Sequence, residues 1–271
     1  MKPTEIAAPG RGAARFETVL QGADRMDSLT ADRDARELVA KSCRMVGGLG
    51  LTKAATGHVS QRSPDGKHVL IRARGKDEIG VRFTQADQVI AVDMEGRKVD
   101  GADGLTAPQE VYLHVHLYRT RPEVQSVVHI HPPTVVLFTI CNVPLQPIYG
   151  GYDPGSLDLM LQGIPTYGRS ITINNFELAR EFGAAMGDKN VCLMRGHGIT
   201  TAGASVEEAT VTAIRLNELA EMNYRAHMLG TPQPIPDEDI AEFKRRRAKR
   251  GKGENVHMNS TWRYYADLSG A

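Results

Sequence analysis

The sequence has few cysteines, almost no net charge and no long apolar run. Its 3 cysteines are Cys43, Cys141 and Cys192, and they form no C-x-x-C pair. An odd number at this spacing argues against a disulfide framework or a thiolate zinc site, and it fits reduced thiols in a cytoplasm. The 33 basic and 32 acidic residues leave a formal charge of +1. No bulk field therefore draws the surface to nucleic acid or to an anionic membrane.

Signals for export and membrane insertion are missing from the pattern as well. No apolar stretch approaches the roughly 18 residues that cross a bilayer. The first thirty residues carry no apolar region of the kind found in secretory signals. We therefore expect a cytoplasmic protein with no nucleic-acid or membrane partner.

Composition predicts one main domain with an extension at each end. The 271 residues are 41% apolar and 24% charged, which is enough to bury one sizeable core. Residues 1–29 contain prolines, glycines and mixed charges, and we expect them to form a flexible N-terminal extension. Residues 30–230 are the expected domain. Beyond Gly230 the chain turns to prolines and a basic run, so we expect 231–271 to be a C-terminal arm.

Strands and helices alternate along the expected domain. An amphipathic helix begins near Thr30, because apolar residues recur at three- and four-residue steps as far as Gly47. A capping box at Ser205 starts the longest helix. The pattern predicts strands at 58–60, 68–73, 88–93, 124–130, 171–173 and 191–194, and further helices at 108–119, 132–140 and 175–186. This alternation is typical of an α/β domain whose mixed sheet is covered by helices.

Two of the 9 histidines stand two positions apart at the end of a predicted strand. In an extended chain such positions point the same way, so His129 and His131 can both face one metal ion. Pro132 and Pro133 follow immediately and end the strand. The simpler alternative is a pair of histidines that only forms hydrogen bonds, and the H-x-H spacing by itself favours that alternative.

A third histidine lies in a glycine turn after another predicted strand. His197 is flanked by Gly196 and Gly198, which let the backbone approach other groups closely. It is either an ordinary turn residue or a third ligand, because strand ends in an α/β sheet can gather at one edge. Three neutral imidazoles with open positions would make a Lewis-acid centre.

One carboxylate is a candidate for acid–base chemistry. Glu110 is in the first turn of the helix expected from Pro108, and His114 and Tyr118 follow on the same helical face. Glu110 either stabilises the helix N-terminus, or acts as a fourth metal ligand or as the general acid/base beside the metal. In the functional interpretation, His114 and its face support the site from behind.

In order and spacing these motifs resemble the class II aldolase/adducin family. They are G-H-V-S at 57–60, I-R-A-R-G at 71–75, A-P-Q-E at 107–110, V-V-H-I-H-P-P at 127–133 and M-R-G-H-G at 194–198. The resemblance implies an α/β/α fold with a central mixed, largely antiparallel sheet, and a homotetramer with active sites at subunit interfaces. It also implies a divalent metal, manganese or zinc, held by His129, His131 and His197, with Glu110 as the acid/base.

The sequence departs from the family's sugar-phosphate aldolases where those enzymes hold phosphate. They use G-N-x-S, T-P-T-G and S-S-E, whereas this chain has G-H-V-S, R-A-R-G and P-Q-E. We therefore expect no compact phosphate cradle. Arg74, with Arg72 or His58 and beside Gly75, suits a planar carboxylate, because guanidinium binds carboxylate through two parallel hydrogen bonds. Alternatively, the arginines lie on a solvated strand face and bind nothing.

We expect a carbon–carbon lyase, since family members that decarboxylate ortho-hydroxy aromatic diacids match these departures. The expected substrate is 3-hydroxy-2-methylpyridine-4,5-dicarboxylate or a similar diacid, with dihydroxyphthalates next. Decarboxylation of such a masked β-keto acid leaves an enolate that a metal stabilises, as retro-aldol cleavage does. The alternatives are an aldolase for a non-phosphorylated hydroxy-keto acid and, third, a non-catalytic scaffold.

Overall fold

The computed structural model describes residues 32–148, 153–250 and 256–271. The predicted extension over 1–29 lies outside these residues. A first helix occupies residues 32–48, as its apolar spacing predicts. None of the helices in the described ranges combines the length and apolar character that a bilayer span requires.

The strands of the described residues form one sheet in the order β4-β3-β2-β1-β5-β8-β7-β6. Every neighbouring pair is antiparallel except β6 and β7, which are parallel. The predicted mixed, largely antiparallel sheet is therefore confirmed. The strands are β1 (His58–Arg62), β2 (Val69–Arg72), β3 (Val89–Val92), β4 (Lys98–Asp100), β5 (Ser126–Ile130), β6 (Thr166–Tyr167), β7 (Val191–Met194) and β8 (Gly198–Gly203).

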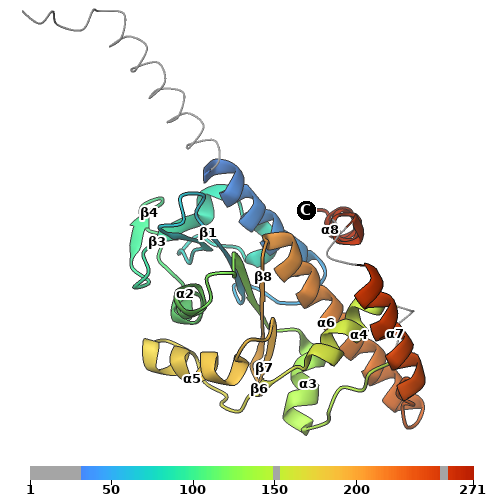
Figure 1. Ribbon diagram of the computed structural model, residues 1–271. Helices are drawn as coiled ribbons and strands as arrows, with labels where there is room; N and C mark the ends of the chain where they lie inside the picture. The colour runs from blue at the N-terminus through green and yellow to red at the C-terminus, as the bar shows by residue number, and fades with distance from the viewer. Residues whose placement is uncertain (1–31, 149–152, 251–255) are drawn as a thin grey trace, which may run out of the picture.

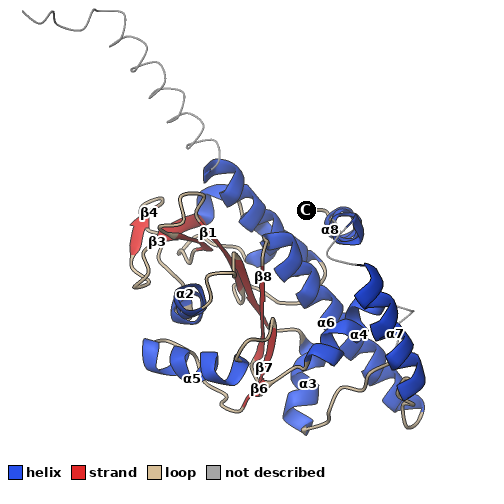
Figure 2. Ribbon diagram, viewed as in Figure 1, coloured by secondary structure: helices blue, strands red, loops and turns tan. Residues whose placement is uncertain are grey.

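Helices cover both faces of the sheet (Figures 1 and 2). On one face, α2 (Val111–Thr120) packs against α5 (Phe176–Met186), and their apolar side chains join those of β2, β3 and β7 in one core cluster. On the other face, α6 (Val206–Leu229) packs with the first helix, α3 (Pro133–Cys141) and α4 (Pro154–Gln162). The fold is thus the expected α/β/α arrangement.

Local sequence signals explain where several helices begin. The side chain of Ser205 accepts a hydrogen bond from the backbone N–H of Glu208 and caps α6. Asn175 caps α5 in the same way, through the N–H of Leu178. Pro133 occupies the first turn of α3, where the missing N–H costs nothing.

The strand predicted at 171–173 is wrong. These residues form no strand, and the edge strand is β6, a few positions earlier. The backbone N–H of Ile173 donates to the carboxylate of Glu110 instead of to a neighbouring strand. The tertiary contact overrides the local β-type pattern.

The C-terminal segment contains two helices, α7 (Asp237–Arg250) and α8 (Val256–Ser269). In α8, Trp262 and Tyr265 are buried in the core cluster beneath α6. Tyr265 also donates a hydrogen bond to Glu218 of α6 at 2.5 Å. This part of the expected arm therefore packs on its own chain, although Tyr264 is exposed.

Candidate active site

The sheet brings His129 and His131 together with His58, which was predicted to bind substrate. His129 lies near the end of β5, and His131 follows the strand. His58 begins β1 and pairs in register with His129, so the two rings stack with centroids 5.0 Å apart. The predicted common orientation of His129 and His131 is realised, since their Nε2 atoms lie 3.0 Å apart.

The glycines around His197 allow the turn between β7 and β8 to close over β5. Gly196 has φ of 60°, a left-handed conformation that favours glycine. At Gly198, a Cβ atom would stand 2.3 Å from the carbonyl oxygen of Ile130. The turn therefore approaches closely, and the ring of His197 lies 4.9 Å from that of His131 and 5.1 Å from that of His129.

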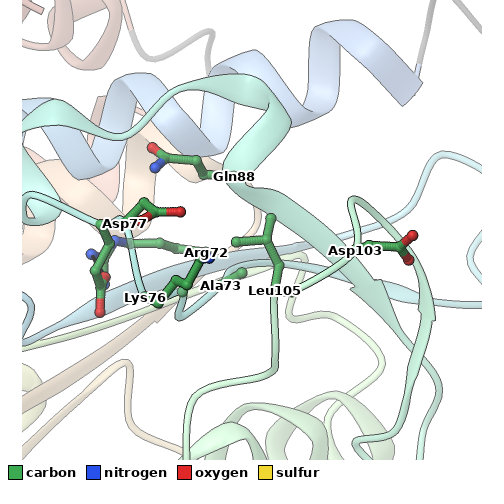
Figure 3. A pocket seen from close by; sticks show the side chains of 10 residues that line it. Arg72, Ala73, Lys76, Asp77, Gln88, Asp103 and Leu105 are labelled. Atoms are coloured by element: carbon green, nitrogen blue, oxygen red, sulfur yellow. Dashed lines mark hydrogen bonds and ion pairs between the residues drawn. The ribbon is translucent and has the colours of Figure 1, made fainter.

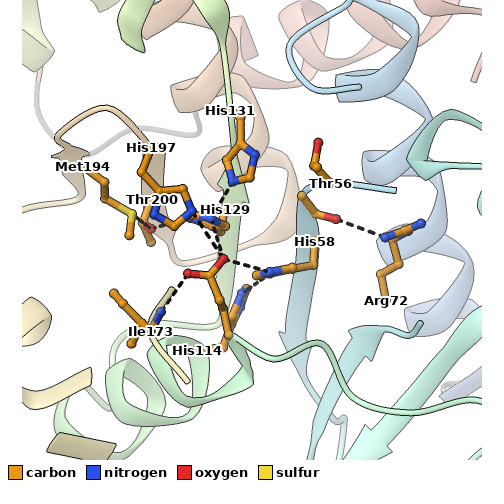
Figure 4. A network of polar contacts seen from close by, with 12 residues as sticks. Thr56, His58, Arg72, His114, His129, His131, Ile173, Met194, His197 and Thr200 are labelled. Atoms are coloured by element: carbon orange, nitrogen blue, oxygen red, sulfur yellow. Dashed lines mark hydrogen bonds and ion pairs between the residues drawn. The ribbon is translucent and has the colours of Figure 1, made fainter. Parts of the chain in front are cut away.

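Glu110 is placed at the start of α2 but does not cap it. Its side chain makes no capping hydrogen bond to the helix. Its Oε1 accepts the backbone N–H of Ile173 at 3.0 Å, and its Oε2 lies 3.2 Å from Nε2 of His129 and 3.5 Å from Nε2 of His197 (Figure 4). The carboxylate is therefore directed at the histidines, and it stabilises the helix by no capping hydrogen bond.

These four side chains form a donor set that fits a divalent cation. One ligand atom each of Glu110, His129, His131 and His197 lies within 4.8 Å of the others. Ligands about 2.1 Å from a tetrahedral ion would stand about 3.4 Å apart, close to the spacing between Glu110 and its histidines. Nδ1 of His197 is buried and has no hydrogen-bond partner among the described residues. The cluster could therefore hold a metal ion.

Burial keeps His131 neutral near neutral pH. Burial lowers the pKa of His131 to about 3, and the nearby charges of His129 and His197 act in the same direction. Burial alone would raise the pKa of Glu110, but the charge and hydrogen bonds of the surrounding histidines outweigh it and lower that pKa. An ionised carboxylate and a neutral imidazole are the forms in which Glu110 and His131 could bind a metal.

A second group of buried polar residues backs His58. Nδ1 of His58 lies 2.7 Å from Nε2 of His114, whose Nδ1 lies 2.7 Å from Oγ of Ser60. The Ser60 hydroxyl in turn lies 2.8 Å from that of Tyr118. His114 therefore stands behind the site, as its helical face predicts, but its hydrogen bonds are with His58 and Ser60.

The two arginines predicted to bind a carboxylate share an internal partner. Arg72 is buried, forms an ion pair with Glu78 at 2.5 Å, and donates to the carbonyls of Ala55 and Gly57. Arg74 is partly exposed, contacts Glu78 at 2.9 Å and also donates to Ala55. Arg72 thus fixes the loop that leads into His58, and its guanidinium is fully engaged.

A pocket of about 100 Å³ lies beside this arginine pair (Figure 3). Arg72 and Gly75 line it, together with Glu78 and Leu105, but none of the clustered metal-binding candidates does. Pockets that bury an organic ligand are typically 300 Å³ or more. The pocket is too small for an aromatic diacid, and the roles of Arg72, Arg74 and Gly75 in substrate binding stay predictions.

Two residues of the site escaped the sequence analysis. Ser60 joins His114 to Tyr118, and its position two residues after His58 on one strand could have indicated it. Thr200 lies 3.1 Å from Nδ1 of His129 and orients that ring. Nothing in the sequence pointed to Thr200, because β8 was not predicted.

The chain belongs to the family described as Class II Aldolase and Adducin N-terminal domain, which matches residues 37–224. It is 36% identical over 234 residues to a 3,4-dihydroxyphthalate decarboxylase of Arthrobacter keyseri, covering 85% of this chain and 92% of the relative. It is 41% identical over 211 residues to a protein of the same description from Terrabacter sp. (strain DBF63), covering 76% and 87%. The structure of an aldolase II superfamily protein from Pseudomonas syringae superposes with a TM-score of 0.76 at 23% identity, over 88% and 93% of the two chains.

These comparisons confirm the predicted family, fold and enzyme class, because the relatives are decarboxylases of that family. They differ from the prediction in the ring of the substrate. The relatives are described as acting on a dihydroxyphthalate, which the sequence analysis ranked second, and not on the pyridine dicarboxylate that it ranked first.

Proposed function

We propose that the protein is a divalent-metal-dependent decarboxylase of an ortho-hydroxy aromatic dicarboxylate, with 3,4-dihydroxyphthalate as the substrate. The observation that carries the proposal is the convergence of Glu110 with three histidines, in a chain similar to decarboxylases over most of its length. The carboxylate beside the 3-hydroxyl group leaves as CO₂, and its ring carbon takes a proton. The product is 3,4-dihydroxybenzoate.

His129, His131 and His197 would hold the metal, through the Nε2 atoms that face Glu110 and one another. A bound divalent cation supplies Lewis acidity toward the hydroxyl oxygen next to the leaving carboxylate. Manganese is the metal we propose for this reaction, and zinc would accompany the aldolase alternative. Both fit a set of imidazoles and one carboxylate.

Glu110 is the acid/base in this proposal. The N–H of Ile173 occupies Oε1, so Oε2 is the oxygen that would take the proton of the substrate's 3-hydroxyl group and deliver it to the ring carbon. The side chain is only 10% exposed, which limits competing proton exchange with water. Oε2 lies 3.2 Å from Nε2 of His129, so the proton that it carries is beside the candidate metal site.

Arg74 is the residue we propose for the carboxylate that stays on the ring. It is the more exposed of the two arginines, with 40% of its side chain accessible against 3% for Arg72. To bind substrate, its guanidinium would exchange part of its contact with Glu78 for the diacid. We further propose that the enzyme is a cytoplasmic homotetramer with sites at subunit interfaces, and that residues 30–230 form its metal-binding domain, on which α8 packs.

The products separate this proposal from its alternatives. Purified protein, loaded with Mn²⁺, is incubated with 3,4-dihydroxyphthalate and separately with hydroxy-keto acids. We expect CO₂ from the diacid, and neither pyruvate nor an aldehyde from the keto acids. Pyruvate or aldehyde release would favour the aldolase, and absence of all products together with absence of bound metal would favour the scaffold.

A further inference from the structure

Strand β1 and helix α2 together place four buried polar side chains in a row behind the candidate metal site. His58 and Ser60 are two positions apart on β1, and His114 and Tyr118 are four positions apart on α2, so each pair shares a face. Their contacts alternate between the two elements, in the order His58, His114, Ser60 and Tyr118 (Figure 4 shows the two histidines). The donor–acceptor distances are 2.7, 2.7 and 2.8 Å.

No side chain in this row is exposed enough to form its hydrogen bonds with bulk water instead. His58 is 5% exposed, Tyr118 is 2%, and Ser60 and His114 are fully buried. A neutral imidazole carries one N–H and one lone pair, so each ring must donate at one nitrogen and accept at the other. The two rings therefore donate in the same sense, either both toward Glu110 or both away from it, and Ser60 donates to His114 only in the first case.

The contacts at the Glu110 end of the row favour one of the two directions. Nε2 of His58 faces Oε2 of Glu110 at 3.9 Å, which is longer than a direct hydrogen bond. The other two imidazoles near this oxygen, His129 and His197, would give their Nε2 lone pairs to a metal and could not donate. An unprotonated Nε2 on His58 would point a lone pair at the carboxylate, so the N–H form is favoured there.

We propose that Tyr118, Ser60 and His114 act as positioning residues that hold His58 in its Nε2–H tautomer, as a neutral hydrogen-bond donor to an anionic oxygen of the substrate. Tyr118 donates to Ser60, Ser60 donates to Nδ1 of His114, and Nε2–H of His114 donates to Nδ1 of His58. His58 then presents its own N–H beside Glu110, where 3.9 Å leaves it able to turn to a substrate oxygen. The role in catalysis rests on the proposed decarboxylation, whereas the tautomers do not.

The tautomers are read directly by long-range ¹H–¹⁵N NMR of histidine-labelled protein saturated with Zn²⁺, which is diamagnetic. Single substitutions His58→Gln and His114→Gln assign the signals. We expect both rings to be protonated at Nε2 and unprotonated at Nδ1. A protonated Nδ1 on His58 would overturn the proposal, whether or not the protein decarboxylates any diacid.

The variants Ser60→Ala and Tyr118→Phe test the positioning role. Ser60→Ala removes the donor to His114, so we expect the ¹⁵N signals of His114 and then of His58 to move toward tautomer-averaged positions. In the same variant kcat should fall by about tenfold, as expected for the loss of one buried hydrogen bond in the transition state, with KM less affected. Tyr118→Phe should act in the same direction with a smaller effect, and it replaces Ser60→Ala if that variant does not fold.

Ser42→Ala is the matched control. Ser42 is a fully buried serine on the opposite face of the sheet, with its hydroxyl 2.6 Å from that of Thr210. Ser42→Ala should lower the free energy of unfolding about as much as Ser60→Ala does, and it should leave the histidine signals and kcat unchanged. Equal kcat and equal histidine spectra in the two variants would show that Ser60 is only structural, and would overturn the proposal.

Discussion

The backbone N–H of Ile173 donates to Oε1 of Glu110 at 3.0 Å, across a separation of 63 positions in the sequence. This bond places the carboxylate with one oxygen occupied and the other, Oε2, directed at the histidines. It also accounts for the missing strand at 171–173, because the N–H that would join a sheet is used here. A backbone N–H group thus orients a side chain instead of pairing with a neighbouring strand.

Replacement of Glu110 by Gln tests its role as the acid/base. The amide oxygen can still accept the N–H of Ile173, so orientation should be kept while the mobile proton is lost. We expect kcat to fall by about 10²- to 10⁴-fold, the usual contribution of a general acid/base, with metal content retained. The control Glu123→Gln alters an exposed carboxylate at the other end of α2, and full activity in Glu110→Gln would contradict the assignment.

Removal of single histidines tests the metal site. His129→Ala, His131→Ala and His197→Ala should each lower bound metal to well below one per chain, measured by elemental analysis after gel filtration. His68→Ala is the control, because His68 lies between β1 and β2 and outside the cluster. Stoichiometric metal in all three variants would exclude this cluster as the site.

Replacing each of the two arginines should have a different effect, on stability for Arg72 and on substrate binding for Arg74. Arg72→Ala removes a buried cation, leaves Glu78 with only the partly exposed Arg74 and leaves the carbonyl of Gly57 without its donor, so we expect the free energy of unfolding to fall by about 3 kcal/mol. Arg74→Ala should leave stability nearly unchanged and raise KM for the diacid by about tenfold or more. Arg97→Ala, at an exposed ion pair, is the control. An unchanged KM in Arg74→Ala would remove Arg74 from substrate binding.

Acid should destabilise the metal-free protein through its buried histidines. Burial lowers the pKa of His114 to about 3 and that of His58 well below 6.5. Between about pH 3 and 6.5 the unfolded chain binds more protons than the folded one, so the free energy of unfolding decreases as the pH falls through this window. Urea unfolding at pH 7.5 and 5.5 should show the decrease, and His114→Phe should reduce it. Equal stability at both pH values would contradict the neutral, buried rings.

The sequence was most informative where local spacing reflects the fold. The H-x-H pair at His129 and His131 ends a strand that is plain in the chain as a short apolar run, and the glycines around His197 indicate a close turn. These patterns predicted which side chains meet, and the structure brings them together with Glu110. Their roles in binding and catalysis remain proposals until the variants are measured.

Strand β8 was not predicted because its residues give little β-type signal. Gly198–Gly203 reads G-I-T-T-A-G, with glycine at both ends and few large apolar side chains. It is nevertheless fully buried, because β5 and β7 flank it and α6 covers it. Its contact with His129 through Thr200 depends on strand order, which local periodicity does not carry.

The arginine strand shows a second limit. Arg72 and Arg74 alternate with Ala73 and look equivalent in the sequence, yet only Arg72 is buried. The difference comes from the hydroxyl of Thr84 and the loop carbonyl of Gly57, which accept hydrogen bonds from Arg72 and not from Arg74. The family resemblance grouped both arginines with His58 as substrate-binding candidates but could not say which one is engaged by the protein itself.

The most direct test of the proposed function follows the ring carbon that loses its carboxylate. Metal-loaded protein is incubated with 3,4-dihydroxyphthalate in D₂O, and the products are observed by NMR while CO₂ is measured. The proposal predicts one equivalent of CO₂ and 3,4-dihydroxybenzoate with deuterium at C2, and no reaction after the metal is removed by a chelator. Unchanged diacid with fully metal-loaded protein, or equal turnover without metal, would contradict it.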